Sequence, residues 1–196
     1  MSRNSRRALW TAKVLGQLPA RGAQVDDEAL AAPYQRRAYQ GVVLGIDPSL
    51  RGTGLALVEF SPNGARLLFS RTVKMPAKQP FATCLAEIFR AVEEALTKAR
   101  VRHAAVEETI FVQNRRAVHI LGAARGAAIA AAAIAGMEVC EYAPLRVKLA
   151  VVGLGRASKD QVAGMVAQHL KLKTALSPDE SDAAATALCH AFTWRG

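Results

Sequence analysis

Hydrophobic and polar positions follow two different rhythms along the chain after residue 40. Five short, largely apolar runs predict strands, at 42–46, 55–60, 65–74, 103–108 and 138–142. Apolar residues spaced three or four apart predict helices, over 80–99, 114–136, 144–152, 158–172 and 177–194. The first three strands follow one another directly, and helices and strands alternate afterwards.

This order of elements predicts an α/β fold, with a mixed five-stranded sheet flanked by helices on both faces. The first three strands would form an antiparallel meander, and Gly52 and Gly54 are interpreted as part of the turn between the first two. The last helix has a clear start: Ser177 as a capping residue, Pro178 in the first turn, and Glu180 placed to reach back to the cap.

Residues 1–40 lack these rhythms, and we predict that they form a basic, disordered N-terminal arm outside a single domain of residues 41–196. The first 25 residues contain five basic side chains and no acidic one. Such a segment is also typical of an organelle transit peptide, or of a start codon assigned too far upstream. The sequence leaves these three interpretations open.

The chain is strongly basic, with 26 Lys and Arg against 16 Asp and Glu and a formal charge of +10. This balance favours a polyanionic partner, either nucleic acid or an anionic membrane face, over a plain soluble basic protein. No uninterrupted apolar run reaches the roughly 18 residues typical of a membrane span. Three widely spaced cysteines match no metal or disulfide framework and favour a reducing, cytoplasmic location: Cys84, Cys140 and Cys189.

Four acidic residues stand at the ends of predicted elements. Asp47 closes the first strand, Glu107 closes the fourth, and Asp179 and Asp182 lie three apart on one face of the last helix. Taken singly, Asp47 could be a turn residue, Glu107 the partner of an arginine, and Asp179 a helix-start acid. Gathered together they would repel one another unless a cation lay between them, and Mg²⁺ prefers oxygen ligands. Their joint occurrence therefore favours a metal site.

Several separated blocks resemble RuvC-type Holliday junction resolvases in order and spacing. They are VLGIDPSLRGTG, AVEETIF, NRRAVHILGAARGAAIAAA, YAPLRVKLAVVGLGRASKDQVAGMV and DESDAAATALCHAF, and they extend over about residues 42–192. The resemblance implies an RNase H-like fold and a homodimer that nicks two strands of a four-way DNA junction symmetrically, in recombination and DNA repair. It also implies two Mg²⁺ ions per active site, with Mn²⁺ as an alternative.

By position, the resemblance assigns catalytic and metal-binding roles to Asp47, Glu107, Asp179 and Asp182. Asp47 would bridge two ions, Glu107 and Asp182 would complete their shells, and Asp179 would be more peripheral. Because alternate side chains of a strand face opposite ways, only one of Glu107 and Glu108 can point at the ions. The register to the following helix favours Glu107.

The resemblance also points to a DNA-binding surface. Lys148 and Lys159 would contact the DNA backbone close to the acids, and Lys159 would stabilise charge on the scissile phosphate. The family usually has an aromatic wedge three residues after the catalytic glutamate, where this chain has Ile110 followed by Phe111, so either residue is a candidate. Where the family often has a lysine before the asparagine of the next helix, this chain has Gln113, and DNA contacts could pass to Arg115 and Arg116.

Three other functions share features with this sequence. The chain could be another RNase H-like nuclease, acting for example on RNA–DNA hybrids, or a junction-binding protein without activity. An actin-like ATP-binding protein is disfavoured, because that fold needs two such domains and a second glycine-rich phosphate loop. Whether a branch-migration helicase complex is a physical partner does not follow from the sequence.

Overall fold

The computed structural model describes residues 38–108 and 115–195. Their elements are, in chain order, β1 (Gly41–Asp47), β2 (Gly52–Ser61), β3 (Gly64–Lys74), α2 (Phe81–Leu96), β4 (Val101–Glu107), α3 (Arg115–Ile134), β5 (Glu138–Tyr142), α4 (Pro144–Val152), α5 (Lys159–His169) and α6 (Pro178–Thr193). The strands form one sheet in the order β3-β2-β1-β4-β5. The β1–β2 and β2–β3 pairs are antiparallel, and the β1–β4 and β4–β5 pairs are parallel. The predicted mixed five-stranded sheet is confirmed.

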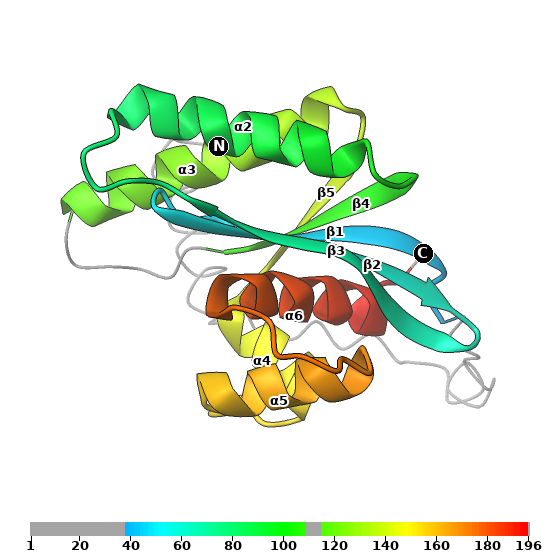
Figure 1. Ribbon diagram of the computed structural model, residues 1–196. Helices are drawn as coiled ribbons and strands as arrows, with labels where there is room; N and C mark the ends of the chain where they lie inside the picture. Colours follow the sequence, from blue (N-terminus) through cyan, green and yellow to red (C-terminus); the bar gives the residue numbers. More distant parts are fainter. Residues whose placement is uncertain (1–37, 109–114, 196) are drawn as a thin grey trace, which may run out of the picture. The chain divides into compact units, whose positions relative to one another are not determined.

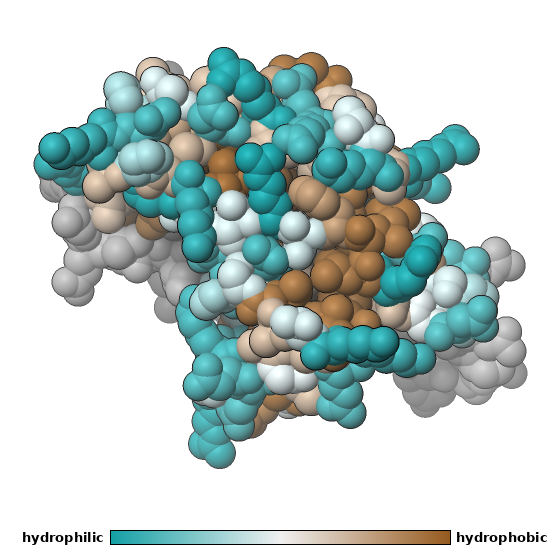
Figure 2. All heavy atoms as spheres, in the orientation of Figure 1, coloured by the Kyte–Doolittle hydropathy of each residue, from teal (hydrophilic) through white to brown (hydrophobic). Residues whose placement is uncertain are grey.

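Helices cover both faces of this sheet, with α2 and α3 on one side and α4, α5 and α6 on the other (Figure 1). Alternation along β1 explains the arrangement, because Val43 enters the core under α4–α6 while Leu44 and Ile46 enter the core under α2 and α3. In the view of Figure 2, hydrophobic residues form a band at the level of the sheet, between more hydrophilic surfaces above and below. The apolar runs are therefore sheet residues packed from two sides.

Helix α3 is unusually apolar for a helix that packs on one side only. Residues 116–134 are long and apolar enough to cross a membrane, although 22% of that stretch is buried inside the fold. Arg125, near the middle of the helix, forms an ion pair with Glu141 of β5. Four fully buried alanines pack into the core shared with α2: Ala124, Ala128, Ala131 and Ala132. A helix that packs one face on the core of a folded domain can pass the same test of length and composition, and these contacts favour that interpretation.

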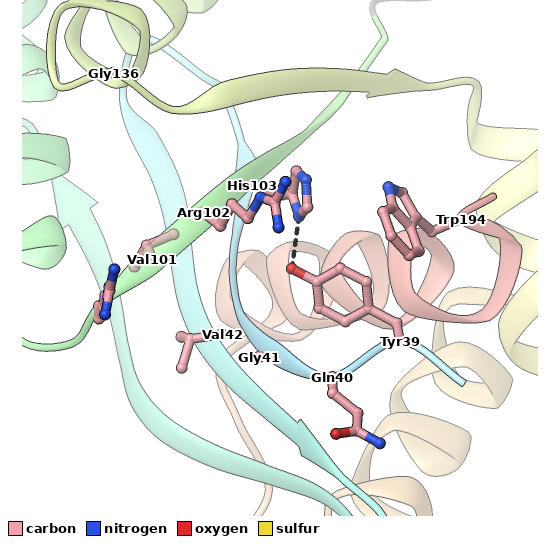
Figure 3. A pocket seen from close by; sticks show the side chains of 10 residues that line it. Tyr39, Gln40, Gly41, Val42, Val101, Arg102, His103, Gly136 and Trp194 are labelled. Atoms are coloured by element: carbon pink, nitrogen blue, oxygen red, sulfur yellow. Dashed lines mark hydrogen bonds between the residues drawn. The ribbon is translucent and has the colours of Figure 1, made fainter. Parts of the chain in front are cut away.

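A cluster of aromatic rings and histidines closes the end of the sheet where β1 and β4 begin. The Tyr39 hydroxyl and His103 Nδ1 form a 2.6 Å hydrogen bond beside Trp194, and a cavity of about 430 Å³ opens there (Figure 3). His190 is fully buried against this cluster, and burial, followed by the neighbouring His103, lowers its pKa to about 4. His190 is therefore neutral near pH 7.

The same cluster changes the expected domain boundary. Tyr39, which the sequence prediction places in the N-terminal arm, is only 7% exposed and packs edge-on against Phe60 and Trp194. The packed domain therefore begins before residue 41, because an aromatic ring ahead of the first strand completes its core. The rest of the predicted arm, residues 1–37, lies outside the described residues.

Candidate active site

Two of the four acids lie side by side in one cross-strand row of the sheet. Asp47 of β1 pairs with Gly54 of β2, which in turn pairs with Thr72 of β3. On the other side, the preceding residues of β1 and β4 pair in parallel register, so Glu107 is the neighbour of Asp47. Paired residues point to the same face of a sheet. The row therefore presents a hydroxyl, a gap without a side chain and two carboxylates to the face covered by α6.

The gap is what lets the start of α6 reach the acids. A Cβ atom on Gly54 would overlap the backbone carbonyl of Asp179, and one on Gly45 would overlap the carbonyl of Ala183. A Cβ on Gly52 would lie 3.0 Å from Oδ2 of Asp179. The prediction that Gly52 and Gly54 form a turn is wrong, because both lie within β2 and leave room for the helix.

The other two acids, Asp179 and Asp182, lie in the first turns of α6. Ser177 caps the helix by accepting a hydrogen bond from the backbone N–H of Glu180, and Pro178 follows as predicted. Asp182 receives a 2.8 Å hydrogen bond from Nζ of Lys159 and is 20% exposed. Lys159 opens α5, whose start is fixed by a capping box. Two helix starts thus face the carboxyl ends of β1 and β4.

The pKa values of the two strand acids record this crowding. Burial, followed by the charges of Asp182 and Asp179, raises the pKa of Asp47 to about 6, against the opposing charge of Lys159. Burial, followed by the charges of Asp47 and Asp182, raises the pKa of Glu107 to about 7. Asp47 is therefore coupled electrostatically to Asp179 and Asp182, and Glu107 to Asp47 and Asp182.

The two lysines predicted to contact DNA border the same acids. Lys159 and Lys148, the latter on α4, both lower the pKa of Glu107. Glu108, the rival of Glu107, lies one residue beyond β4 and is exposed. Arg116 is exposed at the start of α3, where Arg115 begins the helix. Both wedge candidates lie outside the described residues: Ile110 and Phe111.

The donor chemistry of this site fits a hard divalent cation. Its ligand atoms are carboxylate oxygens, and a cation would relieve the repulsion that raises the pKa of Asp47 and Glu107. Within residues 38–108 and 115–195, however, no three His, Cys, Asp or Glu side chains are grouped closely enough to hold one ion. The ammonium of Lys159 holds Asp182 instead. The acids are neighbours whose side chains would still have to close around an ion.

We expect the metal-free protein to lose stability as the pH rises from about 4 to about 7. The native state keeps protons on Asp47 and Glu107 that the unfolded chain, with values of 3.8 and 4.5, has already released. Stability is therefore fully present below about pH 4 and falls as these groups ionise, by about 3 kcal/mol for a shift of about two units on one group. Urea unfolding in chelator at several pH values measures this change.

The variant Asp47→Asn separates this effect from other titrations. It cannot ionise at residue 47 and removes one charge from beside Glu107, so it should be more stable than the parent at pH 7.5 and nearly equal at pH 4.5. Divalent cation should stabilise the parent more than the variant. Equal free energies of unfolding for the parent and Asp47→Asn at pH 7.5 would show that the crowded carboxylates do not destabilise the fold.

Comparison with solved structures places this fold among those of Holliday junction resolvases. The yeast mitochondrial Holliday junction resolvase Ydc2 shares the fold at 11% identity, with a TM-score of 0.57 over 87% of this chain and 85% of that one. The RuvC structure from Thermus thermophilus is 39% identical, with a TM-score of 0.71 over 77% of this chain and 93% of that one. The same protein in complex with a Holliday junction substrate gives 0.73 over 78% and 94%.

The fold is thus of the RNase H-like class, as in these resolvases. The family model for the crossover junction endodeoxyribonuclease RuvC matches residues 43–190. The RuvC of Hyphomonas neptunium is 46% identical over 152 residues, covering 76% of this chain and 89% of the relative, and that of Halorhodospira halophila is 41% identical over 149 residues with the same coverage. The chain belongs to the RuvC family.

Proposed function

We propose that this protein is a structure-selective DNA endonuclease that resolves four-way (Holliday) junctions by paired, symmetric nicks, in recombination and DNA repair. The reaction is hydrolysis of a phosphodiester bond. One observation carries the proposal: Asp47 and Glu107 lie side by side beneath the start of α6, in a RuvC-family chain with a formal charge of +10. A relative of 39% identity binds a Holliday junction substrate in its solved structure.

The proposed cofactor is Mg²⁺, two ions per active site, with Mn²⁺ as the alternative. Asp47, Glu107 and Asp182 would hold the ions and Asp179 would take a more peripheral place. When bound, such ions activate an attacking water and stabilise the leaving oxygen of a phosphodiester. Burial and mutual repulsion of the carboxylates favour any cation that enters. Lys159, which binds Asp182 in the absence of metal, would exchange this contact for one with the scissile phosphate.

DNA binding would extend from this edge over the neighbouring basic side chains. Lys148 and Lys159 border the acids, and Arg115 and Arg116 start the helix that follows the proposed wedge, Ile110 or Phe111. Phosphate contacts of this kind release counterions, so the affinity should fall steeply with salt.

A symmetric cut in two strands calls for two active sites, and we propose a homodimer. The surface of α3 suits a two-fold contact, because only 22% of this alanine-rich helix is buried and it carries Val118 and Ile134, the latter 74% exposed. A branch-migration helicase complex is a further proposed partner, and the cytoplasm is the proposed location.

The decisive experiment offers the purified protein three substrates: a synthetic four-way junction, a linear duplex of the same sequence and an RNA–DNA hybrid. With Mg²⁺ we expect paired nicks in the junction and little cleavage of the other two, and with chelator no cleavage. Preferred cleavage of the hybrid would favour a ribonuclease of the same fold. Tight junction binding without any cleavage, in either metal, would favour the non-enzymatic alternative.

A further inference from the structure

A set of side-chain hydrogen bonds ties the start of α6 to the edge strand β3. Ser70 Oγ donates to Glu180 Oε2 at 2.7 Å, and Thr72 Oγ1 lies 3.4 Å from Glu180 Oε1. The Thr72 hydroxyl also shares a 2.8 Å hydrogen bond with the hydroxyl of Ser177, the capping residue. We call these four residues the β3–α6 latch: Ser70, Thr72, Ser177 and Glu180.

The latch uses a side chain that the local sequence assigns to another task. In α5, the third residue of the helix, Gln161, reaches back to the N–H of the capping Ser158 and completes a capping box. Glu180 holds the equivalent position in α6, and the sequence predicts the same contact. That prediction is wrong, since the Glu180 carboxylate turns to β3 and binds Ser70 and Thr72. Of the two capping-box contacts, α6 keeps the bond from the Glu180 N–H to Ser177, while the Glu180 side chain binds the sheet.

The latch lies on a different face of the helix start from the acids. Asp179 and Asp182 are three residues apart and share a face, whereas successive residues of a helix are turned by about 100°. Glu180 therefore points to β3, whereas the Asp179 carboxylate lies beside Gly52 of β2 and the charges of both aspartates act on Asp47. Thr72 belongs to the same cross-strand row as Asp47, so the anchor and the acids are fixed to one line of the sheet.

The site needs such an anchor because its own charges oppose its assembly. The charges of Asp182 and Asp179 raise the pKa of Asp47, so ionised acids push the start of α6 away from β1. Contact of α6 with Gly45 and Gly54 resists only motion into the sheet. The hydrogen bonds of the latch end on a charged carboxylate, so they resist movement of the start of α6 away from the sheet or along it. Such bonds are among the stronger ones in proteins.

We propose that Glu180 is a positioning residue, which through Ser70 and Thr72 holds Asp179 and Asp182 at the distance from Asp47 and Glu107 that a divalent cation requires. The inference rests on the proposed function, because it concerns the same site. Its consequence is specific: loss of the latch weakens cation binding and leaves junction binding without metal unchanged. Mutation of residues that orient metal ligands commonly lowers the metal affinity by about 10- to 100-fold.

The test compares Glu180→Ala, Glu180→Gln and the double variant Ser70→Ala/Thr72→Val with the parent. The matched control is Glu59→Gln, which alters a carboxylate bound to Arg66 in the same β2–β3 hairpin. We expect Glu180→Ala to raise the Mg²⁺ concentration for half-maximal cleavage about tenfold. The double variant should do the same, Glu180→Gln should recover most of the loss because its amide oxygen still accepts from Ser70, and Glu59→Gln should match the parent.

Two further measurements do not depend on cleavage. Hydrogen exchange of the first amides of α6 should become faster in Glu180→Ala, and the rise of melting temperature with Mg²⁺ should need about tenfold more metal. A lower melting temperature with an unchanged Mg²⁺ requirement would reduce the latch to a purely structural contact and overturn the proposal. If the parent fails to cut junctions, the proposed function fails, and these two measurements still decide for or against the latch.

Discussion

Replacing Asp47 with asparagine should abolish junction cleavage while the protein still folds and binds the junction. Asp47 ends β1 next to Glu107 and beneath the start of α6, and the charges of Asp182, Lys159 and Asp179 act on its carboxylate. An amide of the same shape removes the charge that a cation requires. We expect the single-turnover cleavage rate to fall by about a thousandfold, or about 4 kcal/mol in activation free energy. Gel assays on a labelled four-way junction measure it.

The matched control is Glu108→Gln, one residue beyond the end of β4. Glu108 is exposed, and its backbone N–H binds the carbonyl of Tyr142 whatever its side chain. Its cleavage rate should stay within about threefold of the parent, while Glu107→Gln should behave like Asp47→Asn. Cleavage retained in Asp47→Asn would move the active site elsewhere, and equal losses at Glu107 and Glu108 would contradict the assigned register.

The acids could be predicted because each stands where a clear local rhythm stops. Apolar runs that end in Asp47 and Glu107 indicate buried strands with a carboxylate at the rim, and Ser177 with Pro178 indicates a helix start that carries Asp179. Those signals depend only on residues that are close in the sequence, so they can be interpreted without the tertiary structure. The joint occurrence of the four acids favoured convergence on a cation, and the resemblance to a family then gave each acid its role.

The sequence prediction missed those features in which a residue contacts another that is far away in the sequence. Gly52 and Gly54 resemble a turn, yet they belong to a strand whose bare backbone receives α6 from more than a hundred residues away. Glu180 resembles a capping-box residue, yet it binds Ser70. Glycines between two apolar runs are equally consistent with a turn and with close packing, and only the tertiary contact distinguishes them.

These features share one physical task. Four carboxylates collected in a partly buried site raise the free energy of the metal-free fold, as the pKa values of Asp47 and Glu107 show. Close packing on glycine and the latch to β3 supply the opposing free energy without adding positive charge beside the acids. The site stays ready for a cation because its scaffold, and not an internal salt bridge alone, holds it together.

The variant Gly54→Ala should damage both the fold and the active site, although it adds a single methyl group. Its Cβ would overlap the backbone carbonyl of Asp179, and backbone cannot move aside as the end of a flexible side chain can. The start of α6 must rise from the sheet and carry Asp179 and Asp182 away from Asp47. We expect a loss of about 2–3 kcal/mol in the free energy of unfolding and at least a hundredfold slower cleavage at saturating Mg²⁺.

The control is Gly164→Ala in α5, where a Cβ atom meets nothing within 4 Å. Alanine is the better helix former, so this variant should gain about 0.5–1 kcal/mol and cleave like the parent. Urea unfolding and single-turnover cleavage on the same preparations separate the two effects. If Gly54→Ala unfolded more easily yet cleaved normally once folded, α6 would not position the acids. Normal stability and normal cleavage together would show that β2 can yield instead, and that the bare strand is not what brings the four acids together.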